Sequence, residues 1–107
     1  MPQYLWIAND ATSTIDDSGC HILHTSTAGN TYTINNNVNY PIGTVLTIIN
    51  DSGAADVTIV LSGGAMVLAG VGVVASSSVT LAADGIITAI KTTDNKWLIN
   101  GVGVTVV

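Results

Sequence analysis

The residues of this chain whose types are best suited to chemistry lie in one short segment, Cys20-His21-Ile22-Leu23-His24. Thiol, imidazole and carboxylate groups bind metal ions when several of them converge on one point. In an extended strand successive side chains point to opposite faces, so His21 and His24 lie on opposite sides. The spacing therefore predicts no metal site, and both histidines are expected in the core or at an interface.

No other arrangement in the sequence is typical of catalysis. The only paired carboxylates are Asp16-Asp17, whose adjacent side chains diverge in an extended chain, whereas glycoside hydrolysis needs two acids that converge. No serine lies in a Gly-x-Ser-x-Gly motif. The segment Gly70-Val71-Gly72 lacks the third glycine and the following helix of a dinucleotide-binding loop. We therefore predict no enzyme activity, no catalytic residue, no cofactor and no metal.

The aromatic side chains offer the remaining binding chemistry. The chain has no phenylalanine, and its five rings are Tyr4, Trp6, Tyr32, Tyr40 and Trp97. Exposed rings can stack on sugars while neighbouring amides and carboxylates supply hydrogen bonds. The same rings are the only large ones available to fill a core, and we expect at least three of them to do so. Trp6, Tyr40 and Trp97 are the candidates for an interface or a ligand platform.

Charged residues are scarce and mostly acidic. They make up 8% of the 107 residues, with two lysines against seven aspartates and a net charge of -5. Two lysines cannot neutralise a row of phosphates, so no nucleic acid partner is expected, and the acidity disfavours anionic lipid. The 48% hydrophobic content predicts that neighbouring subunits cover part of the apolar surface.

No charged residue occurs between Asp56 and Asp84, and a run of this length could cross a bilayer. Glycines and a serine triplet interrupt the run, however, and no basic residue closely flanks it. It begins with the β-branched residues 57–60, which favour a strand over a helix. We therefore predict no membrane span and assign the run to the middle of a β-domain.

Short runs rich in Val, Ile and Thr, bounded by Gly, Asn and Asp, predict an all-β fold. Strands are expected at 4–8, 20–25, 31–34, 44–50, 57–61, 66–69, 71–75, 79–82, 86–92, 96–100 and 102–107. Turns are expected at 35–37, 51–53, 63–64, 84–85 and 93–95. Closely spaced short strands are typical of an antiparallel β-sandwich or barrel of the jelly-roll type. We expect an N-terminal arm or strand in residues 1–15 and a single β-sandwich domain in 16–107.

Three segments resemble a β-module of bacteriophage virion proteins. The first is 17–26 (DSGCHILHTS) followed by 31–34 (TYTI), and the second is 40–51 (YPIGTVLTIIND), which begins with an aromatic-Pro-x-Gly-Thr pattern. The third runs from 80–85 (TLAADG) through Lys91 to 97–101 (WLING). Together they cover most of the chain from residue 16 onward. The loop at 35–37 departs from the family, which commonly has a Pro-containing turn there.

The resemblance implies a structural or adhesive component of the virion, assembled in the host cytoplasm, with no catalytic residues to carry over. It also implies a homo-oligomer, with a trimer favoured, in which the segment 63–75 with Gly70 and Gly72 lies along the subunit contact. Other virion proteins, such as the major capsid protein, are the implied partners.

Two functions are compatible with this class. The sequence starts at Met1 without heptads, a collagen-like repeat or a helical stalk, which favours a head decoration or cement protein that stabilises the capsid. In that case the arm 1–15 is the expected anchoring strand. The alternative is a tail-fibre or tail-spike tip, or an adhesin domain, that binds a host surface glycan through Trp6, Tyr40 or Trp97.

Overall fold

The computed structural model describes residues 3–35, 39–51, 53–61, 67–70, 73–76, 78–94 and 96–106. These residues form ten strands and one turn of 3-10 helix, η1 (Ile15–Asp17). The strands are β1 (Gln3–Trp6), β2 (Ala11–Thr12), β3 (His21–His24), β4 (Asn30–Ile34), β5 (Val45–Asn50), β6 (Val57–Leu61), β7 (Val67–Gly70), β8 (Val73–Ser76), β9 (Ser78–Thr93) and β10 (Lys96–Val106). The prediction of an all-β fold is confirmed.

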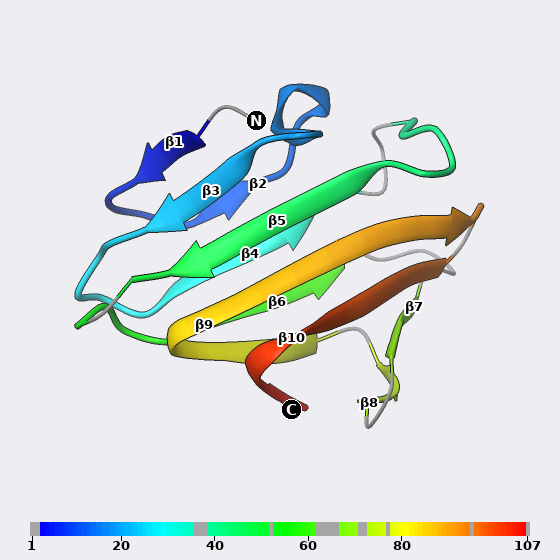
Figure 1. Ribbon diagram of the computed structural model, residues 1–107. Coiled ribbons are helices and arrows are strands. Elements are labelled where there is room, and N and C mark those ends of the chain that lie inside the picture. The colour runs from blue at the N-terminus through cyan, green and yellow to red at the C-terminus, as the bar shows by residue number, and fades with distance from the viewer. Residues whose placement is uncertain are drawn as a thin grey trace.

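All ten strands belong to one mixed sheet, which curls into a half-barrel so that two layers face each other across the core (Figure 1). In the first layer β1, β3 and β5 pair side by side in parallel, and in the second β2, β4 and β6 do the same. Over the first six strands the chain alternates between the layers, so consecutive strands there face each other and do not pair.

The pairing direction corrects one part of the prediction. The expected antiparallel pairing occurs between β9 and each of β5, β6 and β10, and between β7 and β8. The first six strands pair in parallel, as do β10 and β7. The reason is that the segments between the first six strands turn the corner from one layer to the other, whereas a hairpin turn would have paired neighbouring strands.

β9 connects the two layers. Its first part pairs with β6 and its second part with β5. Residues 84–85, predicted as a turn between two strands, form a corner inside this one strand, where Asp84 has a φ of 64°. β10 follows β9 around the corner, and Gly101 lies opposite Ile87. A Cβ atom at Gly101 would collide with the carbonyl oxygen of Ile86, so β10 requires glycine at the point where it pairs with β9 beside the corner.

The first residues belong to the same sheet. β1 pairs with β3 over all four of its residues, and the backbone N–H of Thr25 donates to the carbonyl oxygen of Trp6 at 3.1 Å. The indole of Trp6 is buried in the core. Residues 1–15 were expected to form an N-terminal arm or strand, and within them residues 3–6 and 11–12 supply the outermost strand at one end of each layer.

The core lies between the two layers and is built from rows of paired inward residues. One row runs through Ile22, Ile48 and Ile87, all at most 3% exposed. Four of the five aromatic side chains are buried as well, which confirms that at least three of them pack the core. No helix in the described part of the chain is long and apolar enough to cross a membrane.

Candidate functional site

The three aromatic residues singled out as a ligand platform lie inside the protein. Trp6 is 5%, Tyr40 2% and Trp97 0% exposed. Trp6 packs edge-on against the ring of His24 at 4.6 Å between centroids, and Tyr40 packs edge-on against Trp97 at 5.5 Å. A sugar needs an exposed ring face, so these side chains do not form a stacking platform. Because the chain has no phenylalanine, these aromatic side chains pack the core.

The two glycines assigned to the subunit contact are only partly within the described residues. Gly70 is the last residue of β7 and pairs with Val73 of β8. Gly72 lies outside the described residues. Their place in an interface therefore stays a prediction.

A buried carboxylate ties the 3-10 turn to both layers. The hydroxyl of Tyr4 in β1 donates to Oδ1 of Asp17 at 2.9 Å, and the hydroxyl of Tyr32 in β4 donates to Oδ2 at 2.7 Å. The backbone N–H of Thr14 also donates to Oδ2, at 3.2 Å. Asp17 is 6% exposed, while its neighbour Asp16 is exposed. Sequence reasoning grouped the two aspartates and missed this difference, because the tyrosines that distinguish them come from distant strands.

The environment of this carboxylate keeps the two tyrosines protonated. Burial, followed by the hydrogen bond to Asp17, raises the pKa of Tyr32 far above its ordinary value. The same causes, in the same order, raise the pKa of Tyr4, whose ring is 39% exposed. Both hydroxyls thus act as hydrogen-bond donors over the whole physiological pH range. The hydrogen bonds of this cluster hold β1, η1 and β4 together.

His24 lies at the centre of a second buried polar cluster. Its Nδ1 is 2.7 Å from Oδ1 of Asn50, and its Nε2 is 2.9 Å from Oδ1 of Asn30. The amide nitrogen of Asn50 donates to the carbonyl oxygens of Ala55 and Leu81, at 2.9 and 3.1 Å. Because that nitrogen is committed, the amide oxygen of Asn50 accepts from Nδ1–H of His24. The two amide side chains thus hold the imidazole ring in place within the core.

The histidines occupy opposite faces of β3, as the spacing predicted. His24 is fully buried, while His21 is half-buried on the outer face. Among the described residues, no three His, Cys, Asp or Glu side chains lie close enough together to hold a metal ion.

The outer side of the first layer carries a continuous surface without charge, here called the uncharged face. One row of paired residues is apolar, a second is polar, and a shorter third is again apolar. The rows are Leu5, Leu23, Ile49 and Ile86; Gln3, His21, Thr47, Thr88 and Asn100; and Val45, Ile90 and Leu98. The large apolar side chains at Leu5, Ile86, Ile90 and Leu98 are between 37% and 60% exposed.

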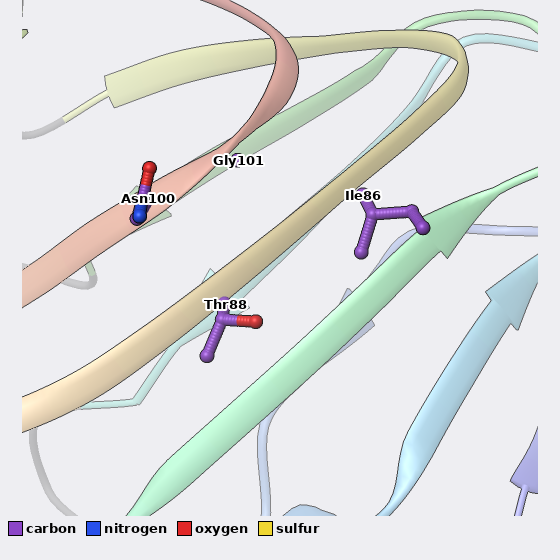
Figure 2. A pocket seen from close by; sticks show the side chains of 4 residues that line it. All are labelled: Ile86, Thr88, Asn100 and Gly101. Carbon is purple, nitrogen blue, oxygen red and sulfur yellow. The ribbon is translucent and has the colours of Figure 1, made fainter.

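An open depression of about 360 Å³ lies within this face, lined by Ile86, Thr88, Asn100 and Gly101. Figure 2 shows Ile86 and Thr88 on the same strand, β9, with Asn100 on β10 beside them. Thr88 and Asn100 are cross-strand partners. Gly101 has no side chain to fill the space next to Ile86. The Thr88 hydroxyl, the Asn100 amide and the Ile86 side chain therefore surround a shallow hollow.

Comparisons with protein-family models, with curated proteins and with solved structures found no match to this chain.

Proposed function

We propose that this protein is a structural component of a bacteriophage virion, a head decoration or cement protein that stabilises the capsid through oligomeric contacts of its β-domain. The virion class rests on the sequence resemblance of the segments at 17–34, 40–51 and 80–101. The observation that supports an assembly role is the uncharged face, which exposes two apolar rows and carries no charge on a chain with a net charge of -5.

The dimensions of the uncharged face are compatible with an interface. Its five strands, spaced by about 4.8 Å, span about 24 Å, and about five residues along each strand span about 16 Å. The face, its polar row included, therefore covers roughly 400 Å² before side-chain relief is counted. Two acidic copies that met elsewhere would bring like charges together, whereas this face brings none.

The first test is the oligomeric state. We expect a homo-oligomer, with a trimer favoured, in sedimentation velocity and native mass measurements at micromolar concentration. Ile90→Lys should dissociate it, because a lysine would be buried without a partner in the contact. Ile42→Lys is the matched control, since Ile42 is 62% exposed and lies outside the uncharged face. A stable wild-type monomer, or an oligomer that survives Ile90→Lys, would contradict assembly through this face.

The second test separates decoration from a tail role. Purified protein is added to capsids that lack it, and binding is measured by co-sedimentation together with the melting temperature of the capsid. A decoration protein should bind saturably and raise that temperature. Binding to purified tails and not to capsids would refute decoration.

The depression in the uncharged face favours one alternative, a tail-fibre tip or adhesin that binds a host surface glycan. The Thr88 hydroxyl and the Asn100 amide are polar groups of the kind that bind sugar hydroxyls, and Ile86 offers an apolar wall. A glycan array would detect such binding. It should be lost in the Thr88→Ala/Asn100→Ala variant and retained in Thr92→Ala, which alters an exposed threonine of the same strand.

A further inference from the structure

β1 has an open edge. Among the described residues it pairs only with β3. The carbonyl oxygen of Trp6 accepts from Thr25, so the backbone groups of Trp6 point toward β3. Because this direction alternates along a strand, the N–H and C=O of Leu5 point to the other side, where the described residues provide no strand. Among the described strands, none therefore pairs with the N–H and C=O of Leu5.

The side chains at this edge are exposed although they continue buried rows. Tyr4 is the outermost member of the inward row of Ile22, Ile48 and Ile87; those three are at most 3% exposed, but Tyr4 is 39% exposed. Leu5 begins the outward apolar row and is 60% exposed. Four of the eight large apolar side chains exposed in the described residues lie within residues 4–15. Within the described residues, both the core and the outer face thus end at β1 with exposed side chains.

Within the described residues, the edge also lacks most of the usual protections against strand addition. Natural edge strands are kept very short or are blocked by lysine, proline, a bulge or a covering segment. β1 is short, with four residues. The four residues of β1 include neither lysine nor proline. Their register with β3 is continuous, without a bulge. The edge is therefore competent to pair with another strand.

The charges around the edge are negative. Asp16 is exposed in η1, beside the carboxylate that Tyr4 contacts. Asp10, four residues after the end of β1, is also exposed, and its carboxylate accepts from the backbone N–H of Thr31 in β4. Both lysines of the chain belong to β9 and β10, at least three strands away in the sheet. A second copy would bring acidic groups against acidic groups. A strand with basic ends would place opposite charges there.

From these observations we infer that the open edge of β1 is a docking site for an extended segment of a partner protein, neutral and alternately apolar in its middle and basic at its ends. The segment adds to the sheet as a further strand, with its backbone paired to Leu5 and alternate side chains covering Tyr4 and Leu5. This site is separate from contacts made through the rest of the uncharged face.

A defined peptide tests the site. The probe is the capped nonapeptide Lys-Lys-Thr-Val-Thr-Val-Thr-Lys-Lys, titrated into isotope-labelled protein while backbone amide chemical shifts are recorded. We expect saturable shifts that are largest at Leu5 and its neighbours. A matched peptide with glutamate in place of every lysine should bind at least about tenfold more weakly, because its ends repel Asp10 and Asp16.

Two variants block the edge in different ways. Leu5→Pro removes the outward N–H but no hydrogen bond to β3, so the fold should be retained, as circular dichroism and the melting temperature will show. Leu5→Lys places a charge on the edge. Each should weaken peptide binding at least about tenfold. Ile42→Lys is the control, because it adds the same charge at a site of similar exposure, and it should leave binding within about twofold.

The titration is repeated in the Ile90→Lys variant, in which assembly through the uncharged face is blocked. Retained binding there supports the edge site whether or not the proposed decoration function holds. Unchanged binding in both Leu5 variants, or shifts centred on β9 and β10, would overturn the inference. Leu5 shifts that depend on protein concentration without peptide would assign the edge to a second copy, and so overturn the choice of partner.

Discussion

Replacing Asp17 tests whether one buried carboxylate holds the 3-10 turn against both layers. The Asp17→Ala substitution removes the acceptor of the Tyr4 and Tyr32 hydroxyls, at 2.9 and 2.7 Å, and of the Thr14 N–H at 3.2 Å. Only the Tyr32 hydroxyl belongs to a fully buried side chain. The three lost hydrogen bonds therefore contribute different amounts to the free energy of unfolding.

The magnitude follows from burial. A hydrogen bond to a charged group contributes about 1.5–3 kcal/mol, and the Tyr32 bond should lie in that range because no water replaces the carboxylate. Tyr4 is 39% exposed, so water compensates and its bond contributes less than about 1 kcal/mol. The Thr14 bond resembles a helix cap and adds about 0.5–1 kcal/mol. We expect Asp17→Ala to lower the free energy of unfolding by about 2–5 kcal/mol.

Urea unfolding followed by tryptophan fluorescence measures this change. Asp16→Ala is the matched control, since it removes an exposed neighbouring carboxylate and should change stability by less than about 0.5 kcal/mol. Double-mutant cycles with Tyr32→Phe and Tyr4→Phe divide the effect, and the coupling of Asp17 to Tyr32 should be the larger. Equal losses in Asp17→Ala and Asp16→Ala, or a stronger coupling to Tyr4, would refute the reasoning.

Three further predictions concern pH, the corner of β9 and the buried amide. Burial raises the pKa of the tyrosine hydroxyls, that of Tyr32 above all, over the unfolded value of about 10. The folded state then keeps protons that the unfolded state loses, so stability should be constant with respect to these groups below about pH 9. Above about pH 10 it should fall by up to about 1.4 kcal/mol per pH unit for each buried tyrosine, and a flat urea midpoint from pH 9 to 11 would contradict this. Gly101→Ala should cost at least about 2 kcal/mol in urea unfolding, because the added methyl group meets backbone, whereas Gly29→Ala, with its nearest neighbour at 3.8 Å, should be tolerated. Asn50→Leu should lower stability by about 2–4 kcal/mol, because it leaves an imidazole N–H and two carbonyls unpaired, while the same change at the exposed Asn100 should have little effect; equal losses would contradict it.

The local sequence predicted the strands well where apolar alternation is bounded by turn residues. The segment 57–61 matches β6 at both ends, and the expected strands at 31–34 and 44–50 differ from β4 and β5 by one residue. Alternation also placed His21 and His24 on opposite faces. These features depend only on the period of two along a strand, which a sequence shows directly.

The same local signals did not specify how the strands pair. Asp84-Gly85 has the composition of a hairpin turn, yet the chain bends there within β9, because β6 lies on one side of the bend and β5 on the other. The antiparallel expectation for the first six strands was wrong for a related reason. A corner between two layers and a hairpin use the same Gly, Asn and Asp residues.

The candidate surfaces were less predictable than the strands. Trp6, Tyr40 and Trp97 were considered for binding because aromatic rings suit both a core and a sugar site. Their burial follows from the curvature of the sheet, which closes over them. The uncharged face is formed from residues of several distant segments, so no single segment predicts it. The edge of β1 is open because, among the described strands, only β3 pairs with it, which the sequence of β1 does not show.

By itself the sequence determined that this protein is all-β, that it has little charge to place on its surface, and that its few rings would be needed for a core. Those properties follow from side-chain chemistry and from the geometry of one strand. Only the tertiary structure decided which strands meet. It placed Asp17 beside two tyrosines and His24 between two amides, and it left Leu5 at a strand edge with which no other described strand pairs, because register across a sheet is set by all the strands packing together.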